Sequence, residues 1–91
     1  MVPPHQTPTF AEARVLLLLI AGESPQQAAS NLGVAISTVR SHIRHLHTKA
    51  GTHSLPALIH WGTRSTGRTA LQLAVAADPR WSQAAIEVLP P

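Results

Sequence analysis

The chain of 91 residues contains no cysteine and no tyrosine. The absence of cysteine excludes disulfide bonds, thiolate catalysis and zinc sites built on thiolates. Phe10 is the single phenylalanine, and aromatic residues make up only 3% of the sequence, whose apolar part is dominated by Ala and Leu. Because aromatic and β-branched residues favour strands, whereas Ala and Leu favour helices, this composition predicts an all-α fold.

Long hydrophobic runs are also missing. The longest extends only from Val15 to Ala21, far short of the roughly 20 residues that a membrane-spanning helix needs. The segment from Met1 to Thr9 is polar and rich in proline, unlike a secretory signal peptide. We therefore expect no membrane association and a cytoplasmic location. With 44% apolar residues, the chain should fold as one small domain.

Acidic residues are scarce, and none lies between Glu23 and Asp78. The same stretch contains five basic residues, Arg40, Arg44, Lys49, Arg64 and Arg68. A basic zone of this kind favours a polyanionic partner, with nucleic acid ahead of membrane, although an ordinary solvated surface is the alternative. A nucleic-acid partner would make the protein nucleoid-associated.

Helix start signals divide the rest of the chain into short helices. Thr9 and Glu12 form a T-x-x-E capping box, and Ser24-Pro25 with Gln27 repeats that signal. Glycines 22, 33 and 51 mark the ends of the first three predicted helices. The predicted helices span about 9–21, 25–32, 36 to 49 or 50, 55–64 and 69–77, with a break at 65–67 and a sixth helix from Asp78-Pro79.

The second and third predicted helices carry a helix-turn-helix spacing. Ala29, Gly33 and Val39 follow the pattern A-x3-G-x5-V. The small residue lets the helices approach, the glycine makes the turn, and the β-branched residue packs one helix on the other. Leu32, Val34, Ile36 and Ile43 are predicted to fill the remaining inward positions.

The segments "TFAEARVLLLLIAGESPQQAA" and "NLGVAISTVRSHIRHLHTKAGT" together resemble the LuxR/GerE-type DNA-binding domain of bacterial transcription regulators. The resemblance covers residues 8–64, and its most specific part is T-V-R-x-H-I followed by K-x-G. Ala35 stands where the family usually has a serine cap. The resemblance implies a small helical bundle with a four-helix helix-turn-helix domain at 9–64. Outside it, we expect a flexible arm at 1–8 and a C-terminal helical extension at 65–91, which the resemblance does not cover. The resemblance also implies binding to double-stranded DNA.

The third predicted helix separates into two faces when projected at about 100° per residue. Its apolar stripe consists of Ile36, Val39, Ile43, Leu46 and Ala50, and its opposite face is small, polar and positive, as a major-groove helix requires. The resemblance implies base contacts from Arg40, Ser41 and Arg44. The predicted phosphate contacts are Ser37, Thr38, His45, Thr48 and Lys49.

Three histidines in "TVRSHIRHLH" raise the question of metal binding or catalysis. His42, His45 and His47 include no i, i+4 pair, and no acidic residue lies near them in sequence. Neither Ser37 nor Ser41 has a carboxylate-oriented histidine nearby in sequence. We therefore expect no metal site, no cofactor, no small-molecule ligand and no enzymatic activity. His42 is either a structural residue or a phosphate contact.

The fourth predicted helix suggests how two copies would meet. Leu55, Leu58, Ile59 and Gly62 form one stripe, which leaves Ala57, His60 and Trp61 on the outward side. Related domains pair through this helix, so the resemblance implies a homodimer with Trp61 as its anchor. The alternative is that the apolar tail covers Trp61. Its possible packing faces are Leu71, Ala74 and Val75, and Trp81, Ala84, Ala85, Val88 and Leu89.

Two other functions are compatible with the sequence. One is a domain similar to region four of sigma factors, which shares the architecture and also reads DNA. The other is a helical protein-interaction module that has kept the turn but lost DNA binding. Duplex binding that weakens steeply with salt would separate DNA readers from the interaction module.

Overall fold

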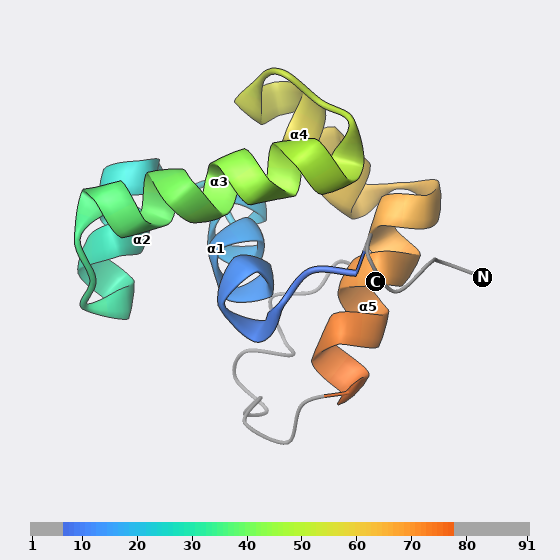
Figure 1. The fold of residues 1–91 in the computed structure, drawn as a ribbon, viewed down its shortest axis with the longest axis horizontal. Coiled ribbons are helices and arrows are strands. Elements are labelled where there is room, and N and C mark those ends of the chain that lie inside the picture. Colours follow the sequence, from blue (N-terminus) through green and yellow to red (C-terminus); the bar gives the residue numbers. More distant parts are fainter. Residues whose placement is uncertain (1–6, 78–91) are drawn as a thin grey trace.

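The computed structural model describes residues 7–77 and contains five helices and no strand within that range. They are α1 (Phe10–Ile20), α2 (Pro25–Leu32), α3 (Ile36–Ala50), α4 (Leu55–Thr63) and α5 (Ser65–Ala77). Figure 1 shows α3 lying across α1, with α2 beyond one end of the crossing and α4 and α5 at the other. The predicted all-α fold is confirmed. The predicted sixth helix falls outside the described residues.

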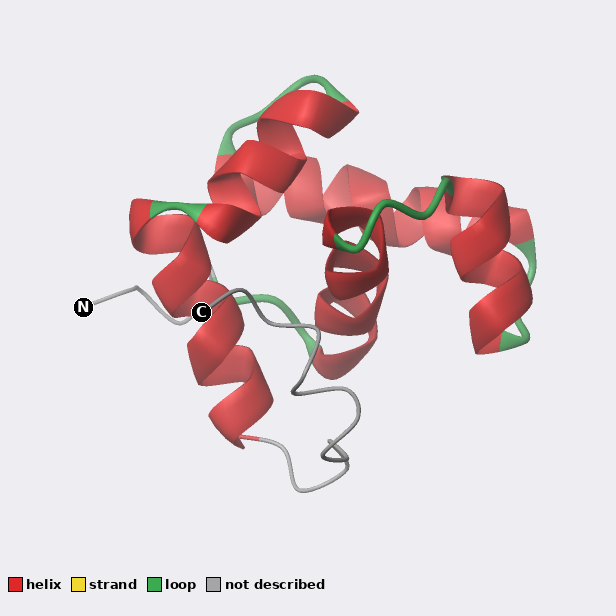
Figure 2. Ribbon diagram, turned by 180° about the vertical axis from the view of Figure 1, so that it is seen from behind, coloured by secondary structure: helices red, strands yellow, loops and turns green. Residues whose placement is uncertain are grey.

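Helix α1 forms the centre of the bundle, because it contacts each of the other four described helices. Val15, Leu16, Leu17 and Leu19 are buried, so this helix is apolar around most of its circumference, as its sequence predicts. Figure 2 shows from behind how short loops connect the helices around it. The resulting single core also takes in residues of α2, α3, α4 and α5.

The predicted start signals of α1 and α2 are both present as complete capping boxes. The Thr9 hydroxyl accepts a hydrogen bond from the Glu12 amide, and the Glu12 carboxylate accepts one from the Thr9 amide. Ser24 and Gln27 make the equivalent reciprocal pair at α2. Each pair satisfies two backbone donors that a helix N-terminus leaves without partners, which fixes where these helices begin.

The helix-turn-helix geometry follows the predicted spacing. Ala29 and Val39 are buried in the contact between α2 and α3, and Gly33 ends α2 with φ of 68°. That left-handed conformation is disfavoured for residues with a side chain, so glycine suits the turn. Val34 is an exception to the predicted inward set, because it is 41% exposed. It lies within the turn itself, where the chain runs along the surface.

The predicted break at residues 65–67 is wrong, because α5 begins at Ser65. Arg64 alone makes the turn, in an extended conformation with φ of −134° and ψ of 147°. Gly67 is buried, and a Cβ atom there would lie 1.9 Å from the Trp61 carbonyl oxygen. The glycine therefore serves close packing of α5 on α4, not chain flexibility. Leu71 and Ala74, from one of the predicted packing faces, are buried.

Candidate nucleic-acid interface

Helix α3 is held against the bundle by one apolar stripe. Val39, Ile43 and Leu46 are buried, and Ile36 and Ala50 pack against the same core at the two ends of the helix. The stripe is the one predicted from the sequence, so the orientation of α3 about its own axis is confirmed. At its N-terminus, Ala35 provides no side-chain cap, and at its C-terminus Gly51 ends the helix.

The outward face of α3 is polar and basic. Arg40 and Arg44 are exposed, and Ser41 between them is partly exposed. Both guanidinium groups therefore extend from a helix that is anchored by its opposite side. The other predicted contact residues on this helix that are exposed are Ser37, Thr38, His45 and Thr48. Six of the eight predicted DNA-contacting side chains are thus exposed, and the other two, Ser41 and Lys49, are partly exposed.

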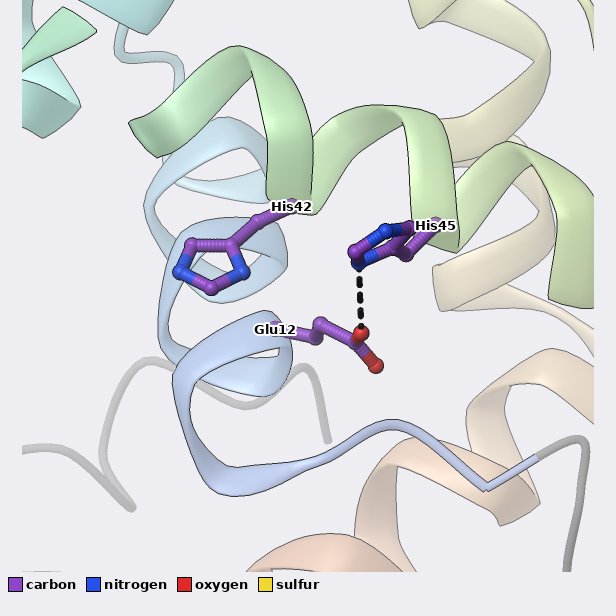
Figure 3. A group of neighbouring side chains, drawn as sticks. All are labelled: Glu12, His42 and His45. Atoms are coloured by element: carbon purple, nitrogen blue, oxygen red, sulfur yellow. Dashed lines mark ion pairs between the residues drawn. The ribbon is translucent and has the colours of Figure 1, made fainter. Parts of the chain in front are cut away.

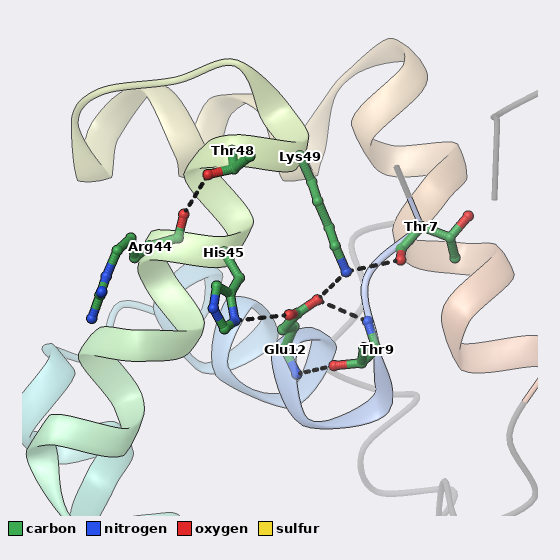
Figure 4. A network of polar contacts seen from close by, with 7 residues as sticks. All are labelled: Thr7, Thr9, Glu12, Arg44, His45, Thr48 and Lys49. Atoms are coloured by element: carbon green, nitrogen blue, oxygen red, sulfur yellow. Dashed lines mark hydrogen bonds and ion pairs between the residues drawn. The ribbon is translucent and has the colours of Figure 1, made fainter. Parts of the chain in front are cut away.

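Lys49 extends toward α1 and forms an ion pair there. Its Nζ lies 2.5 Å from Oε1 of Glu12 and also donates a hydrogen bond to the Thr7 carbonyl oxygen, at 3.3 Å (Figure 4). The Lys49 side chain is 20% exposed and that of Glu12 is 6% exposed. The ammonium group is therefore already paired with a buried carboxylate. The sequence offered no signal for this contact, because the two residues are 37 positions apart.

The Glu12 carboxylate is the centre of this polar network. Burial raises the pKa of Glu12, but the hydrogen bond from Lys49, the backbone hydrogen bond from Thr9 and the nearby Lys49 and His45 outweigh burial, so the pKa lies below its ordinary value of 4.5. A carboxyl whose pKa falls on folding contributes stability above its unfolded pKa, and this contribution is lost as the pH falls through the folded pKa. Glu12 is thus expected to be ionised at neutral pH.

Two hydroxyl groups near the end of α3 already have protein partners. The Thr48 hydroxyl donates to the Arg44 carbonyl oxygen at 3.2 Å (Figure 4), and it retains lone pairs that can accept. The Thr52 hydroxyl is hydrogen-bonded to Nδ1 of His47 at 2.8 Å. His47 is therefore tied to the turn after α3, separate from the outward face.

The predicted dimer residues of α4 differ in exposure. His60 is exposed and Ala57 is partly exposed. The sequence predicts Trp61 on the outward side, whereas the structure packs its partly buried side chain against the core. Gly67 of α5 lies directly against Trp61, so part of the C-terminal extension does cover it.

Among the described residues, no helix is long and apolar enough to cross a membrane.

Comparison with known proteins gives one family. The model of the family described as bacterial regulatory proteins, luxR family, matches residues 9–62, which is more than half of the chain. The matched region contains α1 to α3 and all of α4 except its last residue. No curated protein and no solved structure matched.

Proposed function

Because the chain belongs to the luxR family of bacterial regulatory proteins, we propose that it binds double-stranded DNA in a sequence-specific manner, with α3 in the major groove. The observation that carries this proposal is the division of α3 into a buried apolar stripe and an exposed basic face. A helix anchored in this way presents its outward side chains as a rigid unit. Regulation of transcription is the biological role that follows from family membership.

Base reading is assigned to the middle of the outward face. Arg40 and Arg44 are long enough to reach base edges, and a guanidinium group can donate two hydrogen bonds to O6 and N7 of guanine. Ser41 lies between them and is short, which lets the helix backbone approach the groove closely. No acidic residue lies between Glu23 and Asp78, and the Glu12 carboxylate, 3.5 Å from His45, is buried and paired with Lys49, so it repels the phosphates little.

Phosphate contacts are assigned to the two ends of the same face. Ser37 and Thr38 are exposed in the first turn of α3, where no side chain caps the helix. Backbone amides at an uncapped N-terminus favour a phosphate oxygen. His45 and Thr48 are exposed further along and complete the set. Lys49 keeps its ion pair with Glu12 in this proposal, so its effect on DNA is indirect.

Selection of bound duplexes from a random pool, followed by footprinting, tests the proposal. The selected duplexes should share a common sequence, and their affinity should fall steeply as salt concentration rises, because phosphate contacts release counterions. Duplex binding without a shared sequence would refute base reading. The absence of any salt-dependent binding would refute DNA binding altogether and favour the helical interaction module.

Replacing Arg44 by Ala should weaken binding to the selected duplex by about 1–3 kcal/mol and relax the preference at one base pair. The side chain is exposed, so the fold should be unaffected. Fluorescence anisotropy on the selected and a scrambled duplex measures both effects. Arg64→Ala is the matched control, because it removes an equal charge from an exposed position outside α3. An equal loss of affinity for both duplexes would indicate that Arg44 contacts a phosphate and not a base.

A single domain of this size reads one half-site, so useful specificity requires two copies. We place the contact between copies on α4 at Ala57 and His60, next to Trp61, whose partly buried side chain packs against the core and against Gly67 of α5. The expected target is an inverted repeat, because a two-fold dimer reads two half-sites related by its own symmetry.

Ala57→Glu should reduce the stoichiometry on a duplex with two inverted half-sites from two chains to one, because two like charges would meet across the two-fold axis. Analytical ultracentrifugation of protein and duplex measures this. Gln72→Glu is the control, because it adds the same charge at an exposed position on α5. Two chains per duplex for the Ala57 variant, or one for the unmodified protein, would contradict the contact at α4.

A further inference from the structure

Three side chains with metal-ligating atoms converge between α1 and α3. Glu12 comes from α1, and His42 and His45 come from α3 (Figure 3). One ligand atom from each residue lies within 4.8 Å of the others. Burial differs among them, since Glu12 is buried, His42 is partly buried and His45 is exposed. The group is thus open to solvent on one side and backed by the core on the other.

The spacing of these atoms is close to what zinc requires. Zinc binds histidine nitrogen and carboxylate oxygen at about 2.0–2.2 Å in tetrahedral geometry, which places ligand atoms about 3.3 Å apart. Nδ1 of His45 lies 3.5 Å from Oε2 of Glu12, so this pair needs almost no adjustment. The remaining separations are at most 4.8 Å, and side-chain rotation of the partly buried His42 would close the difference.

The two oxygens of Glu12 have different partners. Oε1 accepts hydrogen bonds from the Thr9 amide and from Lys49. Oε2 is the oxygen that faces His45. A cation at Oε2 would therefore leave the capping box and the ion pair in place, and those contacts would orient the carboxylate. Carboxylates that bind metals are commonly oriented by hydrogen bonds of this kind from outer partners.

We propose that Glu12, His42 and His45 bind a divalent transition-metal cation, with Zn²⁺ the best match to two imidazoles and one carboxylate. Three protein ligands leave a fourth position for water. The site would join α1 to α3 and hold His45 against Glu12. His45 is also assigned to a DNA phosphate above, so a bound cation would withdraw it from that contact. The metal site itself does not depend on DNA binding.

Titration of the full chain with Co²⁺, followed by competition with Zn²⁺, tests the site without any DNA. Four-coordinate Co²⁺ should give intense visible absorption bands that Zn²⁺ abolishes. Loss of an outer partner already weakens metal binding by about 10–100-fold, so removal of a direct ligand in His42→Ala or His45→Ala should weaken it at least tenfold. Because His45 is 58% exposed, its variant should fold normally, and circular dichroism checks this.

His53→Ala serves as the control, because it removes an exposed histidine outside the group. This variant should bind Co²⁺ as the unmodified protein does. The proposal is overturned if the absorption bands do not appear, if His45→Ala binds with unchanged affinity, or if His53→Ala abolishes binding.

Discussion

Replacing Val39 by Asp should abolish cooperative thermal unfolding, because the domain would no longer fold. Val39 is 0% exposed and belongs to the same core as Ala28 and Ala29 of α2. The substituted carboxylate would be buried without a partner, and its desolvation penalty is of the same order as the total stability of a small domain, about 5–15 kcal/mol. Circular dichroism should show little helix, and the melting curve should have no transition.

Thr38→Asp provides the matched control, because it introduces the same charge at the neighbouring, exposed position. That variant should keep its helical spectrum and melting transition while losing affinity for duplex DNA, since a carboxylate would face the phosphates. The pair of variants therefore separates folding from binding. A wild-type melting curve for the Val39 variant would contradict the assignment of Val39 to the buried stripe.

The helices before residue 64 were predictable because their signals are local. The capping boxes at Thr9 and Ser24 act over three residues, and the stripe along α3 depends only on helical periodicity. Each of these signals is physically complete within one segment of the chain. The outward face of α3 followed from the same periodicity, which is why its exposure could be predicted as well.

The junction of α4 and α5 was not predictable because its cause is tertiary. Ser65-Thr66-Gly67 has the composition of a turn, yet the turn is made by Arg64 alone. Gly67 is required where α5 packs on Trp61, and sequence alone does not distinguish a glycine for close packing from a glycine for a turn. The same contact covers part of Trp61.

The polar contacts between α1 and α3 could not be predicted from the sequence for a similar reason. Glu12 is fully accounted for as a helix cap, so nothing local suggested that it also meets Lys49 and His45. A search for metal ligands along one helix finds His42 and His45 without an acid. The fold supplies that acid from another helix, which only the three-dimensional arrangement reveals.

Lys49→Met should destabilise the domain by about 2 kcal/mol, between the values typical of exposed and of buried ion pairs. Methionine keeps much of the apolar stem but removes the ammonium group, which leaves the buried Glu12 carboxylate without its ion-pair partner. For a domain of this size, the melting temperature should fall by roughly 10 °C. Thermal melts of the full chain at pH 7 measure the change. An unchanged melting temperature would contradict a structural role for Lys49.

The double variant Glu12→Gln with Lys49→Met tests whether the loss of stability arises from the Glu12 carboxylate that is left without its ion-pair partner. A neutral amide can still accept the hydrogen bond from the Thr9 amide, so the double variant should be more stable than Lys49→Met alone. The pH dependence gives a second readout. In the protein, Lys49 is a main cause that lowers the pKa of Glu12 against the effect of burial, so the pKa should be higher in Lys49→Met. The stability difference between the protein and Lys49→Met should therefore shrink as the pH falls from 7 to 3.

The single variant Lys49→Met also decides between two roles for Lys49 at the DNA interface. A lysine that contacts phosphate directly contributes about one unit to the slope of log affinity against log salt, and its removal leaves the melting temperature nearly unchanged. A lysine held by Glu12 has the opposite signature, because its charge is already neutralised within the protein. Lys49→Met should therefore lower the melting temperature and leave the salt slope unchanged. A slope reduced by one unit in a protein of unaltered stability would return Lys49 to the phosphate contacts.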